Sequence, residues 1–133
     1  MKKKGPRVRN PRRKPDRYQN IEKHKHPDGT VCDSKRELKR YEELLLMQRA
    51  GVIRDLTVHP RYAITIGGTP IKIRSAGYPN GRHLTYVADF EYHDLERSKL
   101  VIEDVKMQSG FRTEVYKIKK ALMEAMGYAI TEY

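Results

Sequence analysis

The stretch Leu100-Val101-Ile102-Glu103-Asp104-Val105-Lys106 decides the fold expected for this chain. Its apolar residues, which end in two carboxylates and a lysine, predict a central strand that is buried on both faces. Alternate side chains of a strand point to opposite faces, so Asp104 and Lys106 share one face and Glu103 takes the other. Such a buried pair of charges needs a partner. An Asp104–Lys106 ion pair is the simpler interpretation, and a ligand site is the alternative.

Length and composition limit the class of protein. The 133 residues fit one domain with a single core. No run approaches the ~18 apolar residues of a membrane span, and the N-terminus lacks the apolar stretch of a signal peptide. Cys32 is the only cysteine, so no disulfide forms within the chain. These features predict a cytoplasmic protein with no membrane partner.

Positive charge is concentrated at the N-terminus of a chain whose formal net charge is +11. Residues 1–20 combine these bases with three prolines and predict a flexible basic arm, while residues 21–133 predict the folded domain. A basic arm on a nearly balanced body is typical of nucleic-acid binding, although a solubilising tail or a membrane-surface patch has the same composition. The arm's candidate DNA-binding residues are Lys2, Lys3, Lys4, Arg7, Arg9, Arg12, Arg13 and Lys14.

Two helices are predicted from apolar residues at three- and four-residue spacing. The first begins at Ser34 and stops at Gly51, and Ser34 to Glu37 has the pattern of a capping box in which Glu37 reaches back to the Ser34 amide. Glu37 also borders the apolar face of this helix, so its carboxylate could instead point toward a sheet that packs against that face. The second helix runs from about Thr113 to Met126, before a last short strand. Its apolar stripe consists of Val115, Ile118, Leu122 and Ala125.

Residues 52–92 carry the signals of strands and turns. Strands are expected near residues 53–58, 62–66 and 71–73, and a loop from Ser75 to Arg82. Alternation from Leu84 to Tyr92 predicts one strand with Asp89 in its middle, on the face opposite Tyr86 and Phe90. This strand would form a hairpin with the opening stretch. Asp89 and Asp104 would then lie side by side.

Four segments together resemble the PD-(D/E)XK nuclease superfamily, and more narrowly its small phage- and prophage-encoded members related to Holliday-junction resolvases. The segments are Ser34-Lys35-Arg36-Glu37, Tyr86-Val87-Ala88-Asp89-Phe90, Ile102-Glu103-Asp104-Val105-Lys106 and Tyr116-Lys117-Ile118-Lys119-Lys120. The resemblance implies an α/β, restriction-endonuclease-like core of order αβββαβ, with a central mixed sheet flanked by helices. Ala88 departs from the family's pattern, which has proline there.

The resemblance also implies roles for individual residues. Asp89 corresponds to the first acid, Asp104 to the second, Lys106 to the lysine and Glu37 to an acid carried on a helix. Mg²⁺ or Mn²⁺ would be held by Asp89, Asp104 and Glu37, with the Val105 backbone carbonyl as a further ligand. Gln108 falls on the Asp104 face and would support the site. Beyond the arm, the predicted DNA-binding residues are Arg36, Lys117 and Lys120.

These expectations describe a Mg²⁺-dependent endodeoxyribonuclease that acts on branched DNA in phage recombination, replication or packaging. The phosphodiester chemistry is consistent with the residues, because carboxylate-held divalent ions activate water and stabilise a departing alkoxide. Two symmetric cuts would require a homodimer. The alternative is a non-catalytic, basic DNA-binding accessory protein whose carboxylates form only ion pairs.

Overall fold

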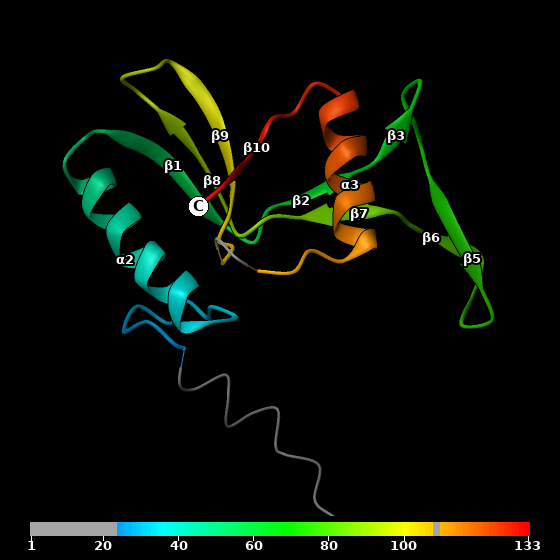
Figure 1. The fold of residues 1–133 in the computed structure, drawn as a ribbon, viewed down its shortest axis with the longest axis horizontal. Coiled ribbons are helices and arrows are strands. Elements are labelled where there is room, and N and C mark those ends of the chain that lie inside the picture. Colours follow the sequence, from blue (N-terminus) through cyan, green and yellow to red (C-terminus); the bar gives the residue numbers. More distant parts are fainter. Residues whose placement is uncertain (1–23, 108–109) are drawn as a thin grey trace, which may run out of the picture. The chain divides into compact units, whose positions relative to one another are not determined.

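The computed structural model of the chain describes residues 24–107 and 110–133 (Figure 1). The predicted basic arm and Gln108 lie outside these residues. The chain consists of two compact units, Met1–Leu38 and Lys39–Tyr133. The elements are α2 (Lys35–Arg49), β1 (Ile53–Val58), β2 (Arg61–Ala63), β3 (Thr65–Ile66), β4 (Thr69–Pro70), β5 (Lys72–Ser75), β6 (Tyr78–His83), β7 (Thr85–Val87), β8 (Phe90–Asp94), β9 (Lys99–Asp104), α3 (Glu114–Ala125) and β10 (Ile130–Glu132).

The largest sheet has the strand order β1-β8-β9-β10. Strands β1, β8 and β9 are antiparallel neighbours, whereas β10 follows α3 and pairs parallel to β9. The predicted strand at the opening stretch is β9, and its residues 101–104 are all buried. A sheet of mixed direction therefore exists, with β9 as one of its two inner strands.

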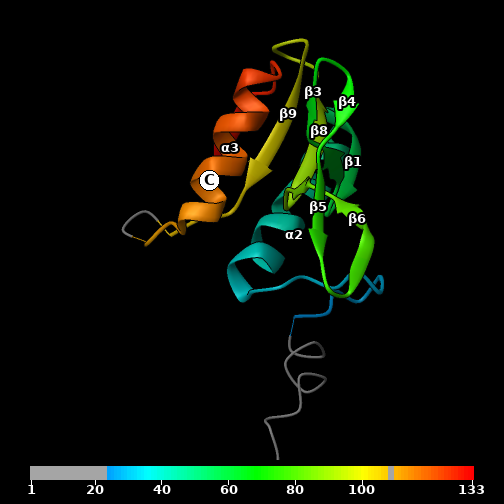
Figure 2. The ribbon, with the colours of Figure 1, turned by 90° about the vertical axis from the view of Figure 1, so that its right-hand side faces the viewer.

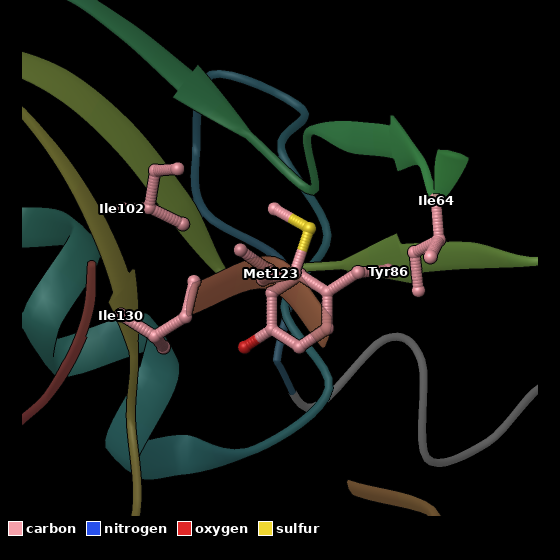
Figure 3. Close-up of a cluster of buried hydrophobic side chains, with 6 residues drawn as sticks. Ile64, Tyr86, Ile102, Met123 and Ile130 are labelled. Atoms are coloured by element: carbon pink, nitrogen blue, oxygen red, sulfur yellow. The ribbon is translucent and has the colours of Figure 1, made fainter. Parts of the chain in front are cut away.

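The two faces of β9 carry different packing. On one face, Ile102 joins Met123 of α3 in a buried cluster with Ile64, Tyr86 and Ile130 (Figure 3). On the other face, Tyr41 of α2 stacks on Phe90 of β8, with ring centroids 6.1 Å apart. Neighbouring residues of a strand face opposite sides, so α3 and the Lys39–Arg49 part of α2 cover opposite faces of the sheet.

Between β1 and β8 the chain makes an excursion of three two-stranded pairs, β2–β7, β3–β4 and β5–β6 (Figures 1 and 2). The pairs meet at a closed ring of three backbone hydrogen bonds. The Ile64 amide donates to Leu84 at 2.9 Å, the Leu84 amide to Ile71 at 2.8 Å, and the Ile71 amide to Ile64 at 3.0 Å. Buried Ile64 anchors this junction to the core, while β5 and β6 remain largely exposed.

The predicted α/β core of order αβββαβ is wrong. The described residues form ten strands against two helices, and the strands are distributed over one mixed sheet and three small ones. The excursion accounts for most of the difference, because its strands are two to six residues long and lack the strong apolar runs that identify a strand in sequence. The predicted loop Ser75–Arg82 belongs to it. Only Ala76 and Gly77 turn there, and Tyr78–His83 forms β6.

Two further predictions about faces are corrected. The strand expected from Leu84 to Tyr92 breaks at Ala88–Asp89, so Tyr86 and Phe90 lie on opposite sides of the core. The predicted apolar stripe of α3 is only partly buried, because the side chains of Val115 and Ile118 are 63% and 56% exposed. Neither described helix is long and apolar enough to cross a membrane.

Candidate active site

Two aspartates meet where β9 ends and β8 begins. The Asp89 amide donates hydrogen bonds to Asp104 Oδ1 at 3.2 Å and to the Glu103 carbonyl at 3.1 Å. In return, Asp89 Oδ2 accepts a hydrogen bond from the Val105 amide at 2.7 Å. The structure thus brings Asp89 and Asp104 together, with each carboxylate bonded to backbone beside the other.

The break between β7 and β8 creates this meeting point. Strand β7 pairs with β2, whereas β8 pairs with β1 and β9, so the chain changes partners at Ala88–Asp89. The change of direction turns Tyr86 toward the face that carries Asp104, and its hydroxyl donates a hydrogen bond to Asp104 Oδ2. Sequence alternation placed Tyr86 with Phe90 and therefore missed it. The only signal for a break was an aspartate amid apolar strand residues.

Lys106 follows Asp104 by two residues, beyond the end of β9. Its amide donates to the Tyr133 carbonyl at 2.9 Å, and the Tyr133 amide donates to the Asp104 carbonyl at 2.8 Å. The Lys106 ammonium lies 4.3 Å from the centre of the Tyr116 ring, on α3. Backbone pairing with β10 and a cation–π contact with α3 therefore orient this lysine.

Glu132 of β10 lies beside Asp104 and is bonded to Tyr116 of α3 and to Arg112, which precedes α3. Glu132, which is level with Asp104 in the parallel register, accepts hydrogen bonds from Tyr116 at 2.8 Å and from Arg112 at 3.3 Å. The Arg112 and Tyr116 hydrogen bonds lower the pKa of Glu132 to about 2. Glu132, Tyr116 and Arg112 escaped prediction as site residues, since only the pairing of β10 with β9 brings them here.

Burial raises the pKa of the Asp104 carboxyl, because the residue is only 3% exposed. The charge of Lys106 and the Asp89 amide oppose the shift, while the negative charge of Glu132 adds to it. Asp104 is thus a buried acid whose negative charge is incompletely balanced by the protein.

Glu103 lies on the opposite face and has a different environment. Its two carboxylate oxygens receive the Arg40 Nε and Nη2 groups at 2.6 and 3.0 Å, and Tyr92 donates to it at 2.7 Å. Arg40 also lies 3.6 Å from the centre of the Tyr133 ring. The assignment of Asp104 rather than Glu103 to the Lys106 face agrees with this geometry.

The remaining predicted residues are in several places. Glu37 and Arg36 lie in the first unit, at the start of α2, where Arg36 is exposed. The Glu37 amide donates to Ser34 Oγ at 3.1 Å, as a capping box requires, and the Glu37 carboxylate accepts from the Asp33 amide at 3.0 Å. Lys117 and Lys120 of α3 form ion pairs with Glu114 at 3.2 Å and with Glu132 at 3.6 Å.

Asp89 and Asp104 have the chemistry to hold a hard divalent cation. Mg²⁺ and Mn²⁺ prefer oxygen ligands, and an ionised carboxylate offers about four lone pairs on its two oxygens. A cation between the two would also offset the burial that raises the pKa of Asp104. The Val105 amide, not its carbonyl, makes the observed contact with Asp89. A carbonyl ligand at Val105 stays a prediction.

The geometry defines a small β-rich domain in which buried Asp104, part-buried Asp89 and Lys106 lie at one end of the mixed sheet. Residues 15–130 match the family described as protein of unknown function, DUF1064. The chain belongs to this family, since the match covers most of its length. Comparison with curated proteins gives no match, and neither does comparison with solved structures.

Proposed function

We propose that the protein is a metal-dependent nuclease that hydrolyses phosphodiester bonds of DNA at Asp89, Asp104 and Lys106. The observation that carries the proposal is the mutual bracing of Asp89 and Asp104 beside the oriented lysine. An ion pair alone does not explain the arrangement well. Adjacent carboxylates such as Asp89 and Asp104 repel one another when both are ionised, and a bound cation relieves that repulsion. Glu132 is separately paired with Arg112 and Lys120.

The chemistry follows from the residues. A divalent ion held by Asp89 and Asp104 would supply the positive charge that activates water and stabilises a departing oxyanion. Lys106 orients the attacking water and balances the charge of the phosphate. Tyr86, through its hydrogen bond, fixes the rotamer of Asp104. Ile102, two residues before Asp104 on the same strand, is held in the buried cluster with Met123.

Branched DNA is the proposed substrate, and paired symmetric cuts would require a homodimer. Both statements rest on the family resemblance of the four sequence segments. The basic arm supports a DNA partner of some kind, because phosphate contacts from Lys and Arg release counterions and favour binding. Phage recombination, replication or packaging is the proposed setting.

A cleavage assay tests the proposal. Labelled duplex, flap, single-stranded and four-way DNA are incubated with wild-type protein, with and without Mg²⁺ or Mn²⁺. We expect cuts only with the ion, and most cuts in four-way DNA. Asp89→Asn should abolish them, whereas Glu96→Gln, which changes an exposed acid in the β8–β9 turn, should not. DNA binding without any ion-dependent cleavage would favour the non-catalytic accessory protein instead.

A further inference from the structure

The β5–β6 hairpin is a charged surface that the sequence analysis treated mainly as a loop. No aspartate or glutamate occurs between Asp55 and Asp89, a stretch that includes the whole excursion. Lys72 and Arg74 of β5 and Arg82 of β6 are all exposed. This part of the folded domain is therefore uniformly positive, whereas the rest of the domain mixes both signs.

These hairpin cations are available to a partner. Among the described residues, Lys72, Arg74 and Arg82 form no ion pair, and the Arg82 guanidinium lies 5.9 Å from the centre of the Tyr78 ring. The predicted DNA-binding residues of α3 differ, because Lys117 and Lys120 are paired with glutamates. Unpaired exposed cations on a surface without acids attract polyanions more strongly than cations held in ion pairs.

A groove lies between the hairpin and α3. Its lining includes Ile73, Arg82 and His83 from the hairpin and Val115 and Lys119 from the α3 side. Lys119 forms no ion pair with any residue that the structure describes. The exposed Val115, expected in the core, borders this groove. Arg82 on the hairpin and Lys119 on α3 therefore bring positive charge to the groove, and Ile73 and Val115 give it apolar surface.

The position of the hairpin relates it to the acidic pair. Strand β7 leads from the junction of the three strand pairs to Asp89, two residues after its end, and the Tyr86 hydroxyl of β7 donates a hydrogen bond to Asp104. Figure 1 shows β5 and β6 extending away from the β2–β7 pair, and residues of the hairpin and of α3 line one groove. Many protein–DNA hydrogen bonds go to phosphate oxygens, and exposed Lys and Arg side chains are common donors to them.

We infer that the β5–β6 hairpin and the facing side of α3 form a docking surface for the phosphate backbone of duplex DNA, with Lys72, Arg74, Arg82 and Lys119 as the contacts. The inference deepens the proposed function, since it assigns where the duplex that leads into the cleavage site is held. The contacts are made to phosphates and so carry no sequence preference.

Binding titrations without divalent ions test this surface separately from catalysis. A fluorescent duplex is titrated over a salt series with wild type, with the hairpin triple variant Lys72→Ala/Arg74→Ala/Arg82→Ala, and with a charge-matched triple, Lys39→Ala/Arg49→Ala/Lys99→Ala. The control residues are exposed, form no ion pair with any described residue, and lie on α2 and at the start of β9. The hairpin triple should weaken binding and reduce the salt slope by about 3, roughly one for each lost phosphate contact. The control should change the slope far less.

Equal losses in both triples, or wild-type binding by the hairpin triple, would overturn the inference. The same titrations are repeated with duplex RNA and with anionic lipid vesicles. If the hairpin triple lost affinity for one of these but not for duplex DNA, the inference would also be overturned. A second comparison uses single changes on one helix. Lys119→Ala should weaken duplex binding more than Lys117→Ala, whose lysine is already paired with Glu114. If the hairpin matters for binding but no ion-dependent cleavage occurs, the docking surface stands and the nuclease proposal fails.

Discussion

Glu103 and Asp104 are adjacent acids at the end of β9, and both are almost fully buried, at 1% and 3% exposure. Glu103 is neutralised by a two-point contact with Arg40 and a hydrogen bond from Tyr92. Asp104 has backbone and phenol donors, with Lys106 as a more distant charge, and burial raises its pKa. Burial alone therefore does not mark a functional acid. The useful distinction is whether the fold supplies a full counter-charge.

The largest expected effect comes from removing the lysine on the Asp104 face. Lys106→Ala should lower single-turnover cleavage by 10²–10⁴-fold, the range typical of a lost proton-transfer or charge-stabilising group. DNA affinity should change little, because one charge is a small part of a net +11. Lys99→Ala is the matched control at the exposed opposite end of β9. A Lys106→Ala protein that cuts at the wild-type rate would remove the lysine from the site.

The Glu103 face should respond in stability rather than in chemistry. Arg40→Met leaves Glu103 buried without its partner, which should cost about 3–5 kcal/mol in the free energy of unfolding. The double variant Arg40→Met/Glu103→Leu should recover most of that loss, since an apolar pair often replaces a buried ion pair at little cost. Urea denaturation of the three proteins measures both values. If Arg40→Met left the free energy of unfolding nearly unchanged, the contact with Arg40 would not be what stabilises buried Glu103.

The pH dependence of stability should separate Asp104 from Glu132. Because burial raises the pKa of Asp104, the native state holds its proton more tightly, and this stability is lost as pH rises above about 4 through the folded pKa. The pKa of Glu132 is lowered to about 2, so its contribution is lost as pH falls from about 4.5 toward 2. Urea denaturation of Asp104→Asn should therefore show a smaller fall in stability above pH 4. An unchanged pH profile would contradict the burial effect on Asp104.

The smallest expected effect concerns Glu37 and decides between its two roles. Gln serves at the same position of a capping box, so Glu37→Gln should change the melting temperature very little. Loss of cleavage with unchanged stability would make Glu37 a member of the metal site. Full activity would leave it as a helix cap only. Ser34→Ala, which removes the observed Oγ acceptor, is the control for capping and should cost about 1 kcal/mol.

Several elements could be predicted because their signals are local. The periodic apolar residues and capping residues identified both helices, and the apolar run at Leu100–Asp104 identified β9. The opposite orientations of Glu103 and Asp104 followed from strand alternation. The connection between β8 and β9 is short, so these two strands pair as a hairpin. That pairing predicts that Asp89 and Asp104 lie close together.

The remainder depends on pairing that is not encoded locally. Alternation across Leu84–Tyr92 looks continuous, yet β7 and β8 choose different partner strands, which moves Tyr86 to the Asp104 face. The register of β10 against β9 brings Glu132 beside Asp104 from 28 positions along the chain. Val115 has helical spacing suited to a core, but its side of α3 is exposed. Short exposed strands such as β6 have no apolar face to predict them.

The most direct test of the account is divalent-ion binding to the acidic pair. Melting temperatures of wild type, Asp104→Asn and the exposed-acid control Glu124→Gln are measured across a Mg²⁺ and Mn²⁺ titration. Wild type and Glu124→Gln should be stabilised, by about 2.7 kcal/mol when the ion reaches 100 times its Kd. Asp104→Asn should lose most of this gain. An absence of stabilisation in wild type at millimolar ion, or an equal gain in Asp104→Asn, would contradict a metal site at Asp89 and Asp104.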